Sequence, residues 1–294
     1  VTACGSYTFL YTVTNGPCTA TASVNIDFYD TPTVSAGTAG STCGLTYLLT
    51  PSASTNCFTP TNTWSQLSGP GTATFSGNNV EVSACGEYTF VYTSVNGPCT
   101  ASASVNIKFY DTPTGTDAGP AQDVCGLTAN LSPTLGTVSC DNGGTVTGAW
   151  SMVPGPAGSA TFSGNSVTVS ECGEYTFRYT TTNGPCSAYD DVTIKFFATP
   201  VIGFDAEPTI VCGYNATVYA AYTLSCSSLG TQTSGWTYSG PLGATATVTL
   251  NTGTLYDIVV SECGDYTFTY TVVNGPCTAT ESFTTTFNET PNPS

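Results

Sequence analysis

The sequence contains no histidine and only three basic residues, Lys108, Arg178 and Lys195, among its 294 residues. Without histidine, catalysis by Ser–His or Cys–His pairs is excluded, and the commonest metal ligand is absent. The 19 acidic residues leave a net charge of −16. Because phosphate recognition needs a basic surface, the composition predicts no nucleic-acid partner and no attraction to anionic lipid.

Long apolar runs and helical periodicity are also absent. No apolar stretch approaches the roughly 20 residues needed to cross a bilayer, which predicts no membrane insertion in this segment. Thr, Ser, Gly and aromatic residues are abundant, and this composition is typical of an all-β protein. The sequence begins with neither a signal peptide nor an initiator Met, so we expect it to be a window on a longer chain.

One stretch recurs four times and organises the chain. Within each copy aromatic residues alternate with Thr or other residues, as in Tyr88, Phe90 and Tyr92, which predicts a strand with one buried face. An Asn-Gly pair follows and predicts a tight hairpin turn before a returning strand. The copies start at Cys4, Cys85, Cys172 and Cys263, and their Asn-Gly-Pro-Cys turns end at Cys18, Cys99, Cys186 and Cys277.

The repeat period suits whole domains, because Cys4 to Cys85 is 81 residues and Cys172 to Cys263 is 91. We therefore predict the C-terminal half of a domain at 1–33 and three full domains at 34–113, 114–200 and 201–294. Short proline-bearing junctions such as Asp30-Thr31-Pro32 separate them. Because proline stiffens so short a connection, we expect adjacent domains to form a semi-rigid rod.

The 14 cysteines recur at regular positions, which predicts disulfides and an oxidising compartment. A zinc site would need clustered Cys-x-x-Cys pairs or His, and the sequence has neither.

Two features of each repeat resemble an immunoglobulin domain. Trp64, Trp150 and Trp236 each follow the second cysteine of a repeat, like the core Trp of immunoglobulin strand C. Gly-x-Tyr-x-Phe runs look like the start of strand F, whose corner tyrosine matches Tyr88, Tyr175 and Tyr266. The resemblance implies tandem immunoglobulin-like β-sandwich domains, stapled by disulfides, with these six residues in the cores.

A narrower resemblance covers the whole chain. The run from Asp117 to Thr128, then Trp-Ser, Gly-Pro-Gly, Ala-Thr-Phe-Ser and Gly-x-Tyr-Thr-Phe, is similar to the PKD-like and Ig-like repeats of large secreted surface proteins of Bacteroidota. That group includes adhesins and filament proteins. The resemblance implies secretion to the cell surface but does not specify function, since such repeats are generic building units.

The immunoglobulin-like topology also implies a disulfide map. Pairing Cys85 with Cys99 is excluded, because the hairpin register separates them by roughly 30 Å. Strands B and F run in the same direction in facing sheets, so both first cysteines of a repeat should lie at one end of the domain. We therefore expect Cys4 and Cys18 to lack partners here and six bridges to close within repeats. They are Cys43–Cys85, Cys57–Cys99, Cys125–Cys172, Cys140–Cys186, Cys212–Cys263 and Cys226–Cys277.

Catalytic and metal-binding candidates are few. Asp190-Asp191 is the only adjacent acidic pair, but neighbours on a strand point to opposite faces, so we predict that the chain is not an enzyme. We expect no cofactor, with Ca²⁺ as the alternative, since hard oxygen ligands suit it. The acids in predicted loops are Asp117, Asp123, Asp141, Asp205 and Glu207.

The sequence thus predicts a structural stalk or filament segment of an extracellular, cell-surface adhesin-like protein. Its expected partners are neighbouring repeats of the same long chain, with self-association into fibres as a further option. Two alternative functions remain open: a carbohydrate-binding array of an extracellular glycan-degrading protein, or a polymerising fibre subunit.

Overall fold

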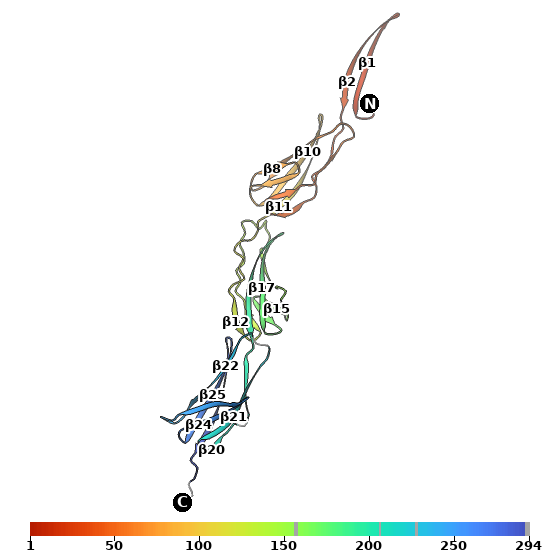
Figure 1. Cartoon of the computed structure of the whole chain (residues 1–294). Helices are drawn as coiled ribbons and strands as arrows, with labels where there is room; N and C mark the ends of the chain where they lie inside the picture. The colour runs from red at the N-terminus through yellow and green to blue at the C-terminus, as the bar shows by residue number, and fades with distance from the viewer. Residues whose placement is uncertain (156–157, 206, 227–228, 292–294) are drawn as a thin grey trace. The chain divides into compact units, whose positions relative to one another are not determined.

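The computed structural model describes residues 1–155, 158–205, 207–226 and 229–291. All secondary-structure elements of these residues are β-strands (Figure 1). The chain divides into two compact units. Unit 1 comprises Val1–Thr116, Leu135–Ala149 and Thr180–Ala188. Unit 2 comprises Asp117–Thr134, Trp150–Tyr179 and Tyr189–Ser294. The domain boundaries at 33, 113 and 200 stay predictions.

Each recurring stretch forms a long β-hairpin with a two-residue turn. Gly16, Gly97, Gly184 and Gly275 adopt φ between 55° and 59° in these turns, a conformation that glycine adopts without steric penalty. The register is the same wherever it is defined: Phe9 pairs with Val24 and Phe90 with Val105. The hairpins are β1 (Gly5–Asn15) with β2 (Cys18–Phe28), β10 (Gly86–Asn96) with β11 (Cys99–Tyr110), β17 (Gly173–Asn183) with β18 (Cys186–Phe197), and β25 (Gly264–Asn274) with β26 (Cys277–Asn288).

The first complete repeat is a two-sheet sandwich. One sheet has the order β4-β11-β10-β7, in which β4 (Gly40–Cys43) runs parallel to β11 and β7 (Thr61–Ser68) antiparallel to β10. The facing strands are β5 (Thr46–Leu48), β9 (Asn79–Val82) and β8 (Ala73–Ser76), together with the pair β3 (Thr33–Ser35) and β6 (Ser52–Ser54). This arrangement of facing sheets is that of an immunoglobulin-like sandwich.

The other two repeats keep the strand order of the hairpin sheet, whereas the facing sheet has three strands in the second repeat and four in the third. In the second repeat the strand orders are β12-β18-β17-β14 and β13-β16-β15; in the third they are β20-β26-β25-β22 and β19-β21-β24-β23. The fold is therefore all-β with tandem immunoglobulin-like sandwiches. The remaining strands are β12 (Gln122–Cys125), β13 (Thr128–Asn130), β14 (Thr147–Met152), β15 (Ala160–Ser163), β16 (Ser166–Val169), β19 (Pro200–Asp205), β20 (Ile210–Cys212), β21 (Asn215–Leu224), β22 (Gln232–Ser239), β23 (Ala246–Thr252) and β24 (Leu255–Val260).

The cores lie between the facing sheets. The corner tyrosines Tyr88, Tyr175 and Tyr266 are buried, and their hydroxyls donate to the carbonyl oxygen four residues upstream at 2.8–3.0 Å. This is the contact of the immunoglobulin tyrosine corner. The three Trp side chains pack against the cores but stay partly exposed. Trp64, Trp150 and Trp236 thus line the cores without being fully buried.

Candidate functional site

Buried asparagine side chains bind the end of one hairpin where it meets the turn of the next hairpin. We call each such place a junction. Junction 1 joins Tyr29-Asp30 to Asn96–Cys99, junction 2 joins Tyr110-Asp111 to Asn183–Cys186, and junction 3 joins Phe197-Ala198 to Asn274–Cys277. All residues of junctions 1 and 2 belong to unit 1, and those of junction 3 to unit 2.

A buried asparagine lies at the centre of each junction. The amide of Asn96 donates to the backbone oxygen and the carboxylate of Asp30, both at 2.9 Å, and to the backbone oxygen of Cys57 at 3.1 Å. Asn183 repeats all three contacts with Asp111 and Cys140, at 2.9–3.2 Å. In the third junction Asn274 donates to the backbone oxygen of Ala198 at 2.7 Å. The Asn-Gly motif predicts only a turn, so this role of the asparagine side chain was missed from sequence.

An aromatic ring packs on the turn glycine of each junction. A Cβ added at Gly184 would lie 2.6 Å from the ring of Tyr110, and one at Gly97 would lie 2.5 Å from the ring of Tyr29. Phe197 packs on Gly275 in the same way. The aromatic residue before each proline-bearing connection therefore covers the next hairpin turn, and only glycine leaves room for it.

The carboxylate of Asp30 is held by backbone donors as well as by Asn96. It accepts hydrogen bonds from the backbone N–H of Asn56 at 2.6 Å and from the Asn56 amide at 3.0 Å. The backbone hydrogen bond from Asn56 stabilises the charged form most and lowers the pKa of Asp30 below its ordinary value. Asp111 accepts the equivalent backbone hydrogen bonds from Ser139 and Cys140.

The disulfides also concentrate at the junctions and follow two rules. In the first, the cysteine before a hairpin bonds to the second cysteine of the next repeat. In the second, the Cys-Gly-Leu cysteine of one repeat bonds to the turn cysteine of the next. The bridges are Cys4–Cys57, Cys85–Cys140, Cys172–Cys226, Cys43–Cys186 and Cys125–Cys277, with Cα–Cα distances of 5.1–6.1 Å. Both cysteines of every bridge lie in the same unit.

The six bridges predicted within repeats are therefore wrong in their partners, and so is the prediction that Cys4 lacks one. Cys99, Cys212 and Cys263, expected to be bonded, are free thiols, as is Cys18. The prediction that Cys43 and Cys85 lie at the same end of a repeat is confirmed, because both lie beside the end of β11. Cys43 is opposite Tyr110, and Cys85 directly precedes Gly86, which pairs with Phe109. The next repeat presents its own cysteines at that same end, and Cys43 and Cys85 bond to these, to Cys186 and Cys140.

Within the ranges that the structure describes, the predicted calcium ligands form no group of three within reach of one ion. Among the described residues, the cluster with metal-ligating atoms in reach of one another is Cys85, Asp111 and Cys140, which contains none of the five loop acids. Its two sulfurs bond to each other. Asp117 and Asp141 instead accept hydrogen bonds from the nearby backbone N–H groups of Gly119 and Gly143, at 2.6 and 3.0 Å.

The adjacent acids Asp190 and Asp191 have separate contacts. Asp190 accepts from the backbone N–H of Ala118 at 2.9 Å. Asp191 binds the guanidinium of Arg178 through two hydrogen bonds of 2.8 and 2.9 Å, and this pairing lowers the pKa of the Asp191 carboxyl. The two carboxylates therefore do not share one site.

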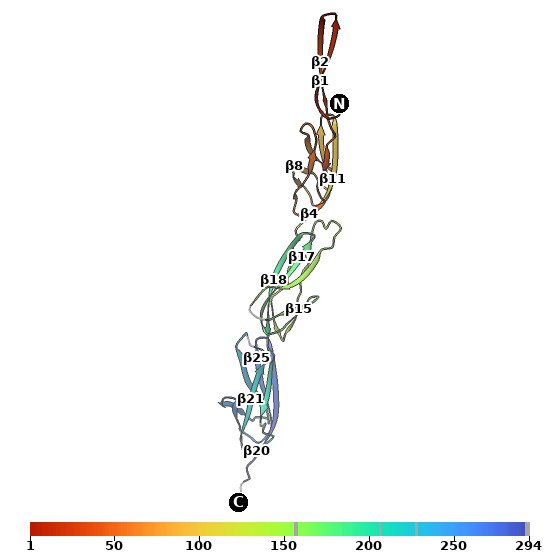
Figure 2. The same ribbon diagram turned by 90° about the vertical axis from the view of Figure 1, so that its right-hand side faces the viewer.

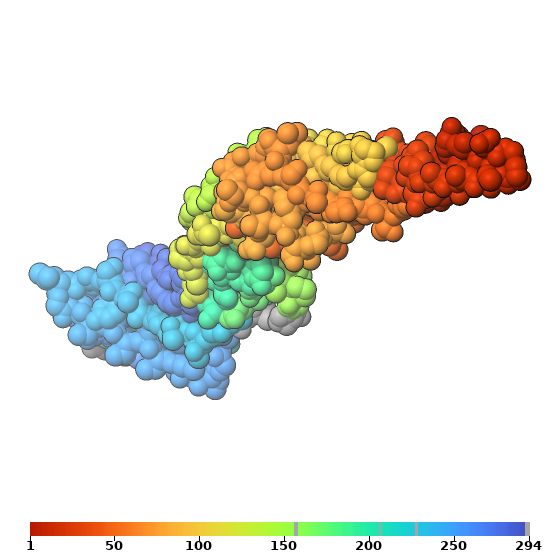
Figure 3. All heavy atoms as spheres, turned by 90° about the horizontal axis from the view of Figure 1, so that it is seen from above, coloured from red at the N-terminus to blue at the C-terminus, as the bar shows by residue number. Residues whose placement is uncertain are grey.

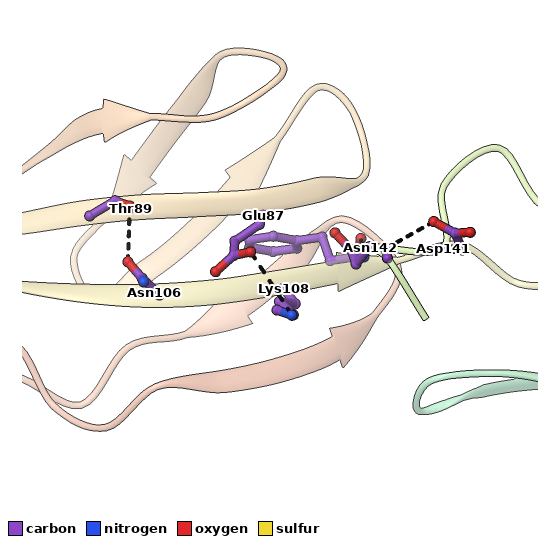
Figure 4. Close-up of polar contacts among 8 residues, drawn as sticks. Glu87, Thr89, Asn106, Lys108, Asp141 and Asn142 are labelled. Atoms are coloured by element: carbon purple, nitrogen blue, oxygen red, sulfur yellow. Dashed lines mark hydrogen bonds and ion pairs between the residues drawn. The ribbon is translucent and has the colours of Figure 1, made fainter. Parts of the chain in front are cut away.

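The outer faces of the hairpins carry cross-strand polar pairs. Lys108 lies 3.9 Å from Glu87, and Thr89 donates to Asn106 at 2.9 Å (Figure 4). Lys195 and Glu174 form the same pair at 3.7 Å. These exposed ion pairs contribute little to stability, since surface pairs are typically worth less than about 1 kcal/mol.

No helix that is long and apolar enough to span a bilayer occurs in the portion of the chain that the structure describes.

No family model and no curated protein matches this chain. Among solved structures, a three-domain I67–I69 fragment of titin aligns at 13% identity with a TM-score of 0.47, over 88% of this chain and 99% of the fragment. Domains 3–5 of Drosophila OTK align at 10% identity with a TM-score of 0.40, over 86% of this chain and 94% of that one. The eight N-terminal Ig domains of DSCAM align at 18% identity with a TM-score of 0.36, over 96% and 40%. These scores are below 0.5, so the fold assignment rests on the strand orders and cores described above.

Proposed function

We propose that this chain is a load-bearing stalk segment of a secreted or cell-surface protein, in which overlapping disulfides maintain covalent continuity. The observation that carries the proposal is the order of the bridges along the sequence. The loop 43–186 overlaps both the loop 4–57 and the loop 125–277, and the three together enclose every peptide bond between Cys4 and Cys277. A single cut anywhere in that range leaves the two parts covalently joined.

Bridges closed within repeats would not have this property. The predicted pairs would enclose 43–99, 125–186 and 212–277 and leave the connections between repeats outside every loop. One cut at a connection would then sever the chain. Bonding each repeat to the next instead encloses the connection within a loop, so that one cut there does not sever the chain.

The composition supports an extracellular setting. Disulfides at this density persist in oxidising compartments, and a net charge of −16 favours a solvated, soluble surface. The sequence motifs described above, from the Asp117–Thr128 run onward, support a relationship to the PKD-like repeats of bacterial surface adhesins. In this setting the chain acts mechanically rather than catalytically.

A designed cut tests the proposal. A recognition site for a sequence-specific protease is inserted after Gly115, which lies inside both the 43–186 and 85–140 loops. After digestion, we expect one species on a denaturing gel without reductant and two fragments with reductant. The matched control replaces Cys43, Cys85, Cys140 and Cys186 with Ser and should separate without reductant. Separation of the unsubstituted, unreduced protein would refute the proposed covalent continuity.

A further inference from the structure

The N-terminal hairpin β1–β2 presents an uncovered apolar face. Phe9, Tyr11 and Val24 are 43%, 71% and 55% exposed. Their counterparts in β10 and β11, namely Phe90, Tyr92 and Val105, are 0%, 7% and 5% exposed. A second sheet faces β10 and β11, whereas no further sheet formed by the described residues lies beside β1 and β2 (Figures 1 and 2). The space-filling view shows the same hairpin, in red, without other segments over it on the side displayed (Figure 3).

This hairpin is nevertheless built as the last hairpin of a sandwich. Its register equals that of β10–β11 at every pair. Tyr7 already forms the corner hydrogen bond, donating to the backbone oxygen of Ala3 at 3.1 Å, as Tyr88 does to Ala84. A two-stranded hairpin is marginally stable by itself and needs further strands or a packed face. The exposed face therefore has the pattern of a surface that another segment covers.

The free thiol of Cys99 is a second, independent observation, and it indicates that the covering segment contains a cysteine. Cys186 and Cys277, the equivalents of Cys99, bond to Cys43 and Cys125. Cys43 ends β4, which runs parallel to β11, and it lies opposite Tyr110. Cys125 ends β12, which runs parallel to β18, and it lies opposite Phe197. The Cys99 sulfur lies 3.9 Å from the backbone oxygen of Tyr29, as the Cys186 sulfur lies 3.5 Å from that of Tyr110. The position equivalent to Cys43 is therefore opposite Tyr29, beside β2.

We propose that β1–β2 binds the front half of an immunoglobulin-like repeat of this same type, joined ahead of Cys4 in the same polypeptide, and that its Cys-Gly-Leu cysteine bonds to Cys99. The tyrosine corner supports a segment of the same polypeptide. Tyr7 binds the backbone oxygen of Ala3 as Tyr88 binds that of Ala84, and Ala84 connects the front half of its repeat to β10. A second copy is disfavoured, since its front halves already pack against their own hairpins. The inference holds whether or not the chain bears load.

Formation of the new bridge is an exchange with a small disulfide. The two cysteines lose their thiol protons, an S–S bond forms between them, and the two electrons pass to the small disulfide, which leaves as two thiols.

The test extends the full chain with a copy of its own front half. Residues 34–84, whose structure is fully described, are joined to Cys4 in place of 1–3, and the protein is refolded with glutathione as the small disulfide. We expect Cys99 to become inaccessible to alkylation and to appear in a bridged peptide with the Cys-Gly-Leu cysteine. We also expect amide exchange in β1 and β2 to slow by roughly 100-fold or more, because the hairpin joins a cooperative core.

A matched control carries Cys43→Ser in the added copy only. Its Cys99 should react again with alkylating agent while β1 and β2 stay protected, which separates covering of the face from the bridge. Unchanged exchange of β1 and β2 in the extended chain would overturn the proposal. So would a dimer of the unextended chain, seen by light scattering, that dissociates when Phe9 and Val24 are both replaced by Ser, since a second copy would then be the occupant.

Discussion

The side-chain amide of Asn96 binds both the backbone oxygen and the carboxylate of Asp30 at 2.9 Å, across 66 residues of sequence. Asn183 and Asp111 form the same pair across 72 residues. The turn of one hairpin thereby recognises the last residues of the previous one. Because the asparagine is buried, leaving its donors unpaired would cost about 1–3 kcal/mol.

The junction around Asp30 should weaken in acid. Its pKa is lowered in the folded state, so its contribution to stability is full above the ordinary carboxyl pKa and is lost as pH falls through the lowered folded value. We expect amide exchange around Asn96, corrected for intrinsic rates, to accelerate over that acidic range. Asp30→Asn should remove most of this pH dependence. The junction of Asn274, where Ala198 replaces the aspartate, serves as an internal control, and equal acid sensitivity there would contradict the mechanism.

Gly184→Ala should destabilise junction 2 more than the same change destabilises an isolated turn. Both Gly184 and Gly164 have positive φ, 55° and 60°, so alanine is strained at each by about 1–2 kcal/mol. Only Gly184 has a neighbour, the Tyr110 ring, that the added methyl would meet. Overpacking of that kind adds roughly 1–3 kcal/mol. Chemical denaturation of G184A and G164A, two turns of the same repeat, measures the difference, and equal effects would mean that the ring moves aside freely.

Trp150→Ala should destabilise its sandwich by about 3 kcal/mol, near the lower end for aromatic truncation because the ring is only partly buried. The indole packs on Tyr179, with ring centroids 4.9 Å apart, and on Phe162 at 6.3 Å. Trp150→Phe keeps part of this contact and should cost less. Denaturation monitored by exchange in β15 and β17 gives the values. Unchanged stability of W150A would place the ring's role at the surface instead.

Alkylation without reduction should label four cysteines. Cys18, Cys99, Cys212 and Cys263 are free, and the other ten are bonded. Mass spectrometry of the unreduced digest should recover Cys43 joined to Cys186 and Cys85 joined to Cys140. A Cys43–Cys85 peptide would restore the pairing within repeats and remove the basis of the proposed continuity.

Stretching a single oxidised molecule should reveal a short covalent path. From Cys4 to Cys277 the shortest route uses three bridges and the segments 57–85 and 125–140. Those segments hold about 43 residues and extend on the order of 150 Å, against on the order of 900 Å for the reduced chain. Replacing Cys125 and Cys277 with Ser should lengthen the path to about 80 residues, on the order of 270 Å. A full-length extension without reductant would contradict the bridge order.

Local features could be predicted from the sequence because they depend on near neighbours. The alternation of Tyr88, Phe90 and Tyr92 with outward residues sets a buried strand face, and the Asn96-Gly97 pair predicts a tight turn. The structure places the two turn residues at Gly97-Pro98 and pairs Asn96 with Cys99, so a register based on an Asn96-Gly97 turn, with Cys99 opposite Ser94, is wrong. The strand and its tight turn still place Cys85 at one end of a repeat and Cys99 at the other. The corner tyrosines follow from the Gly-x-Tyr-x-Phe spacing in the same way.

The partners of the cysteines were decided only by tertiary structure. Two cysteines at the same end of a repeat can bond to each other or to those of the next repeat, and strand register is equal in both cases. The choice depends on how the short connection after Tyr110 brings the Asn183–Cys186 turn against Asp111, with the ring of Tyr110 seated on Gly184. That packing joins residues more than 70 positions apart, so no local pattern encodes it.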